Sequence, residues 1–60
     1  MDRAEAITRL PEAYAVALRL RDAGVSHAQL AAGFGIELQS VPSFLRIAEA
    51  KLAELAEGGR

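Results

Sequence analysis

Residues 26–45 read SHAQLAAGFGIELQSVPSFL, and the fold prediction rests on this stretch. Ser26 and Gln29 have the spacing of a capping box, in which each side chain accepts a hydrogen bond from the other residue's backbone amide at the start of a helix. Apolar residues then recur at helical spacing, at Leu30, Ala31 and Phe34. The stretch therefore predicts a helix over residues 27–34.

Gly35 and Pro42 define the end of that helix and the start of the next. Gly35 can end the first helix, because glycine adopts the left-handed conformation at low cost. A second helix that began near residue 37 would place Pro42 in its interior and lose about 3 kcal/mol. We therefore expect Ser40 to be the N-cap and the helix to run over residues 41–57. A helix, a glycine turn and a second helix form the helix-turn-helix arrangement.

The rest of the chain predicts two further helices and no strands. Good helix formers occupy residues 2–8, and Pro11 is expected to be the first residue of a helix over residues 11–23. Residues 58–60 are expected to be a frayed tail. Three aromatic residues in 60 leave little material for a sheet. The prediction is a single all-α domain, a small bundle of three to four helices that contains the helix-turn-helix.

Composition limits the function classes. Seven basic and eight acidic residues give a net charge of −1, whereas a domain that binds DNA by itself usually carries a basic excess. The chain has no cysteine, so its core must come from helix packing or from a partner, and a homodimer is one expectation. No apolar run is long enough to span a membrane and the start does not resemble a signal peptide, so a cytoplasmic location is expected.

The predicted last helix carries more apolar surface than a small core requires. Its core-facing seam is expected to hold Val41, Leu45, Ala48, Leu52 and Leu55. Phe44 lies at the edge of that seam and Ile47 lies outside it. These two residues pack at the rim of the core or form a contact surface for another protein. The candidate partner interface consists of Leu38, Phe44, Ile47 and Leu55.

From residue 10 onward the chain resembles region four of bacterial sigma factors and related helix-turn-helix domains. The matching features are Leu10-Pro11, the segment 18–21, Gly24-Val25-Ser26, Gln29-Leu30-Ala31, Gly35-Ile36, Val41, Ser43, Leu45, Ala48 and Lys51-Leu52. The resemblance implies a four-helix domain whose third and fourth helices form the helix-turn-helix. In sigma factors such a domain reads a promoter element and contacts RNA polymerase, so duplex DNA and RNA polymerase or another transcription protein are the expected partners.

The sequence departs from this family where the DNA contacts lie. Family members usually carry lysine and arginine at the positions that are Pro42, Phe44 and Ile47 here. The candidate DNA-binding residues that remain are His27, Gln39, Ser40, Ser43 and Arg46. Glutamine can pair with adenine and arginine with guanine. The sequence thus supports two hypotheses: a DNA-binding module in transcription, or a protein-interaction or dimerisation module that kept the fold and lost most DNA contacts.

The polar residues do not predict an enzyme. His27 is the only histidine and has no cysteine beside which it could bind a metal. Glu49, Glu54 and Glu57 are expected to form a solvated helix face, because a domain this small can hardly build a catalytic cleft. We therefore expect no catalytic residues, no metal, no cofactor and no small-molecule substrate.

Overall fold

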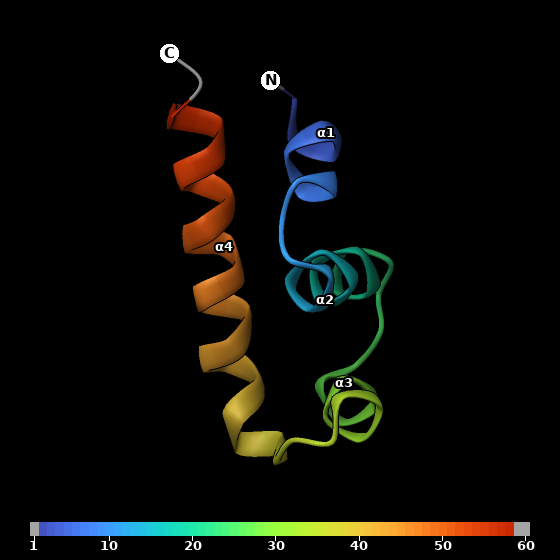
Figure 1. Cartoon of the computed structure of the whole chain (residues 1–60). Helices are drawn as coiled ribbons and strands as arrows, with labels where there is room; N and C mark the ends of the chain where they lie inside the picture. Colours follow the sequence, from blue (N-terminus) through green and yellow to red (C-terminus); the bar gives the residue numbers. More distant parts are fainter. Residues whose placement is uncertain (1, 59–60) are drawn as a thin grey trace.

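Three short helices lie along one side of a long one. The computed structural model of the chain describes residues 2–58, and within them it contains no strand. The elements are α1 (Arg3–Thr8), α2 (Glu12–Asp22), α3 (His27–Phe34), the short 3₁₀ helix η1 (Leu38–Ser40) and α4 (Val41–Gly58). Figure 1 shows α1 beside the end of α4, and α3 beside its start. The predicted all-α fold class is confirmed.

The first two helices begin one residue later than the sequence predicts. Asp2 caps α1 from outside, because its carboxylate accepts a hydrogen bond of 2.8 Å from the backbone amide of Glu5. Pro11 precedes α2 in an extended conformation (φ −50°, ψ 144°), so its assignment as the first helical residue was wrong. That helix also ends one residue early, at Asp22. Pro11 occupies the N-cap position without a side-chain capping hydrogen bond, and Ala23 occupies the C-cap position, where its backbone amide bonds carbonyls of the last turn.

The capping box at the start of α3 is confirmed. The Ser26 hydroxyl accepts from the Gln29 amide at 3.1 Å, and the Gln29 side chain accepts from the Ser26 amide at 3.1 Å. Gly35 ends the helix in the left-handed conformation, with φ 69°. Gly33, inside the helix, has nothing within 4 Å of an added Cβ, so no neighbouring backbone requires a glycine there.

Pro42 falls where a helix tolerates it. Glu37 is extended, η1 forms one turn over the next three residues, and α4 begins at Val41 as predicted. Proline in the first turn of a helix removes no intrahelical hydrogen bond. The helix continues through Gly58, which was expected in the frayed tail, and residues 59–60 of that tail lie outside the described part of the chain.

The core lies between the inner face of α4 and the three short helices. Its buried residues are Ala6, Ile7, Leu10, Ala15, Ala17, Leu18, Leu30, Ala31, Val41, Leu45, Ala48 and Leu52. Leu55 packs against this cluster while partly exposed, so the predicted seam of α4 is confirmed. Leu18 and Val41 are the largest side chains that are fully buried. A core of this size holds α1, α2 and α3 on one face of α4.

Candidate functional site

The five predicted DNA-binding residues are all exposed. Four of them follow one another along η1 and the first turns of α4, and the fifth, His27, is the first residue of α3. The four are Gln39, Ser40, Ser43 and Arg46. These polar side chains are exposed, because the inner face of α4 lies in the core, and Figure 1 shows η1 and the start of α4 at one end of the molecule.

This end of the molecule carries little positive charge. Arg46 is the only cation on η1 and the first two turns of α4, and Glu37 lies just before them. The Gln39 side-chain amide donates to the Glu37 carboxylate at 3.4 Å. Of the arginines in residues 2–58, Arg19 and Arg46 are the two that form no ion pair. Arg46 is therefore the one residue here with a charge to offer a phosphate or a base.

Other cations hold the helices together instead. Arg3 of α1 bonds Glu49 of α4 at 3.1 Å and Asp22 of α2 at 3.2 Å, and Arg21 of α2 bonds both carboxylates as well. The hydrogen bonds from Arg3 and Arg21 hold the pKa of Glu49 below its usual range. The hydrogen bond from Arg21, followed by that from Arg3, does the same for the pKa of Asp22. We call these four residues the ionic cluster.

The ionic cluster corrects one expectation from the sequence. Glu49 does not belong to a solvated face with Glu54 and Glu57, because its carboxylate is partly buried and bonded to two arginines. Position 49 lies at the border between the inner and outer faces of α4, close enough to α1 and α2 for their arginines to reach it. The spacing within one helix gives no signal for such a contact between three helices.

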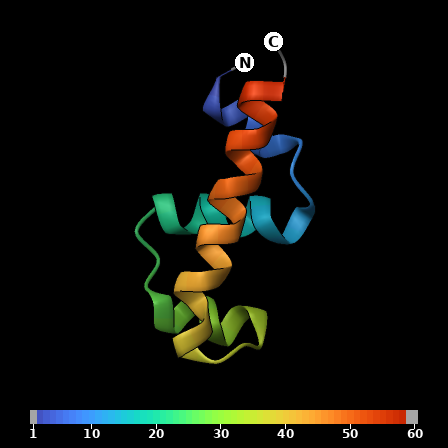
Figure 2. The same ribbon diagram turned by 90° about the vertical axis from the view of Figure 1, so that its left-hand side faces the viewer.

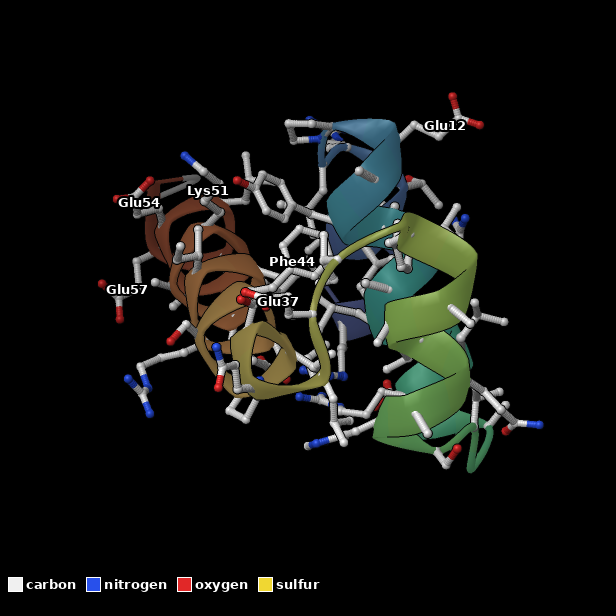
Figure 3. All side chains as sticks on the ribbon, turned by 90° about the horizontal axis from the view of Figure 1, so that it is seen from below. Glu12, Glu37, Phe44, Lys51, Glu54 and Glu57 are labelled. Carbon is white, nitrogen blue, oxygen red and sulfur yellow. The ribbon has the colours of Figure 1, made fainter. Side chains whose placement is uncertain are left out.

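The candidate partner interface divides into inner and outer residues. The Phe44 ring lies 5.4 Å from the Tyr14 ring and 5.3 Å from the Phe34 ring, measured between centroids, and Figure 3 shows it pointing toward the other helices. Leu55 is partly buried against the core. Leu38 and Ile47 are 57% and 47% exposed. Leu38 and Ile47 are therefore the large apolar side chains that η1 and α4 expose.

A hollow of about 270 Å³ between α1 and α4 was not predicted from the sequence. Its lining residues are Arg3, Ala6, Glu49, Leu52, Ala53 and Ala56. The short alanine side chains leave this space, and its only charged groups, Arg3 and Glu49, already bond each other. Within residues 2–58 no three histidine or acidic side chains are grouped to hold a metal ion. The hollow therefore offers an apolar wall without an activated group.

No family model, curated protein or solved structure matches this chain. Within the described residues no helix, α4 included, combines the length and apolar character needed to cross a membrane.

Proposed function

We propose that the chain is a helix-turn-helix module that acts in transcription by binding duplex DNA. One observation carries the proposal. A capped α3, a left-handed Gly35 and an α4 that begins at Val41 leave four polar side chains exposed at the start of the second helix. In helix-turn-helix proteins the first residues of the second helix contact base edges in the major groove.

The exposed side chains have chemistry that suits this role. Arg46 can donate two hydrogen bonds to guanine, Gln39 can pair with adenine, and Ser43 can donate to a phosphate or a base. With one cation and the nearby Glu37, few phosphates are neutralised, so binding is expected to be weak and its salt dependence shallow. Specific recognition by the isolated chain would then depend mainly on Arg46 and Gln39.

Titration of labelled duplex DNA at low salt tests the proposal. Binding of an isolated module is expected in the micromolar range, and Arg46→Ala is expected to weaken it about tenfold, as for the loss of one base contact. Arg19→Ala removes the other arginine of residues 2–58 that forms no ion pair, from α2, and is the matched control. If duplex DNA shows no salt-dependent binding at tens of micromolar, the proposal is wrong for this chain.

A second candidate function is a protein-interaction module, with another copy, RNA polymerase or another transcription protein as the partner. The observation that favours it is the exposure of Leu38 and Ile47 beside the candidate DNA contacts. Large exposed apolar side chains gathered on one surface are typical of protein contacts.

Solution mass across a range of concentrations tests self-association. Ile47→Lys is expected to reduce the mass at high concentration. Leu20→Lys, at a residue 38% exposed on α2, is expected to leave it unchanged. An equal effect of both substitutions would contradict an interface on α4.

A further inference from the structure

Within residues 2–58, no other helix covers the outer face of α4. Figures 1 and 2 show α1, α2 and α3 on one side of α4 and none of them on the other. The residues of this outer face are all exposed: Ser43, Arg46, Ile47, Ala50, Ala53, Glu54 and Glu57, of which Ala53, at the edge, also lines the hollow beside α1. An 18-residue helix is about 27 Å long, so the fold leaves an extended surface uncovered along α4.

Two opposite charges on this face, Arg46 and Glu54, are placed symmetrically about Ala50, whereas Glu57 has the uncharged Ser43 as its counterpart. Arg46 lies four residues before Ala50 and Glu54 four residues after it. At 100° per residue they lie about 40° to either side of Ala50, and each is about 6 Å from it along the axis. Neither forms an ion pair within residues 2–58. In Figure 3, Glu54 points away from the other helices.

We propose that this face binds the same face of a second copy, with the two α4 helices antiparallel and Ala50 beside the two-fold axis. Such an axis places residue 46 of one copy opposite residue 54 of the other. The dimer therefore contains two equivalent Arg46–Glu54 pairs, and each Ile47 lies opposite an Ala53. The small Ala50 side chains allow the helix axes to approach to the ordinary packing distance of about 8–10 Å.

The charges select the antiparallel arrangement. A parallel pair would place Arg46 opposite Arg46 and Glu54 opposite Glu54, which is unfavourable at both positions. The antiparallel pair replaces these two repulsions with two attractions. The half of the face that contains Glu54 also favours a second copy over DNA, because the Glu54 carboxylate attracts Arg46 of the other copy and repels phosphate.

The dimer has a consequence for the first proposed function. It covers Ser43 and Arg46, so a chain in the dimer cannot present them to DNA. One helix face buries less than the roughly 800 Å² per partner of a standard stable interface, so the dimer is expected to be weak. Dimerisation and DNA binding then compete for the same surface. Dimerisation is favoured at high protein concentration and DNA binding at low concentration.

Charge reversal tests the arrangement, with sedimentation equilibrium at low salt as the measurement. Glu54→Arg and Arg46→Glu are each expected to weaken dimerisation at least about tenfold, because each leaves like charges opposed at two places. The double variant Arg46→Glu with Glu54→Arg restores both pairs and is expected to dimerise within about threefold of the original chain. Arg19→Glu on α2 is the control, and circular dichroism checks that each variant is folded.

The inference rests on the second candidate function, protein interaction. The outcomes below distinguish a failure of the antiparallel pairing from a failure of self-association. A dimer that Ile47→Lys weakens but that the double reversal does not restore overturns the antiparallel pairing and leaves an interaction surface on α4. A monomer at every concentration overturns the pairing and self-association together. DNA binding is measured independently, and the double reversal is expected to dimerise without binding DNA, because it lacks Arg46.

Discussion

The eighteen residues of α4 form an inner and an outer face, and the two faces have different roles. On the inner face Val41, Leu45 and Ala48 are almost completely buried against three shorter helices. On the outer face Arg46 and Ala50 are exposed, and Figure 2 shows the three short helices on the opposite side of α4. The inner face therefore determines stability and the outer face is available for binding. Substitutions around the helix should show effects on unfolding that decrease from the inner face to the outer face.

Leu45→Ala, on the inner face, is expected to have the largest effect. Leu45 is 5% exposed, and truncation of a buried leucine costs about 2–5 kcal/mol through lost burial and the cavity left behind. For a chain whose total stability is on the order of 5 kcal/mol, much of the protein would then be unfolded at 25 °C. Urea unfolding followed by circular dichroism measures the change. A loss below about 1 kcal/mol would contradict the assignment of this face to the core.

Phe44→Ala, at one border between the faces, is expected to have the next largest effect. The ring is partly exposed and packs against two other aromatic rings, so the cost should be about 2 kcal/mol, below the usual range for a fully buried ring. Phe44→Leu keeps most of the apolar contact and is the control. If both variants were as stable as the original chain, Phe44 would belong to the outer face instead.

Glu49→Gln, at the opposite border, is expected to cost about 1 kcal/mol at pH 7, because the partly exposed ion pairs with Arg3 and Arg21 are screened by solvent. Since its pKa is lowered in the folded chain, the carboxylate stabilises the fold above the pKa of the unfolded state, about 4. That contribution is lost as the pH falls through the lower, folded pKa. The difference between the original chain and Glu49→Gln should therefore shrink in acid.

Unfolding measured from pH 7 down to pH 2 checks this dependence. Glu54→Gln, on the outer face, removes the same charge where no ion pair forms within residues 2–58, and is the matched control. A Glu49→Gln difference that stayed constant through acid would show that the charge of Glu49 is not what stabilises the fold.

Ile47→Ser, on the outer face, is expected to have the smallest effect on folding. Ile47 is nearly half exposed, and surface substitutions away from special features usually change stability by less than about 0.5 kcal/mol. Thermal unfolding at micromolar concentration, where the proposed weak dimer would be dissociated, gives the intrinsic effect. A loss as large as that of Leu45→Ala would remove the distinction between the two faces.

Local signals in the sequence predicted the ends of α3 and the start of α4. Ser26 and Gln29 cap α3, Gly35 ends it, and Pro42 falls in the first turn of the next helix. Each of these depends on backbone amides and dihedral angles within four residues, so the sequence contains the necessary information. The apolar spacing of α4 predicted its buried seam for the same reason.

Contacts between distant elements were beyond the reach of these signals. Glu49 was expected in solvent but is bonded to Arg3 and Arg21. For Phe44 the sequence allowed either packing at the rim of the core or a contact surface, and the structure places it beside Tyr14 and Phe34. Both residues lie at the borders of the α4 seam, where helical periodicity cannot distinguish buried from exposed. The candidate DNA-binding residues were named from the sequence, and their binding to DNA is a proposal.

The amino-acid sequence alone was enough to specify four helices and the face of α4 that turns inward, because capping, glycine conformation and apolar period are local properties of the chain. The packing of the helices settled which arginines are engaged in ion pairs and which one, Arg46, is left at the start of α4. The position of a charge relative to other helices depends on how those helices pack. The uncovered outer face is likewise a consequence of all three short helices packing on one side.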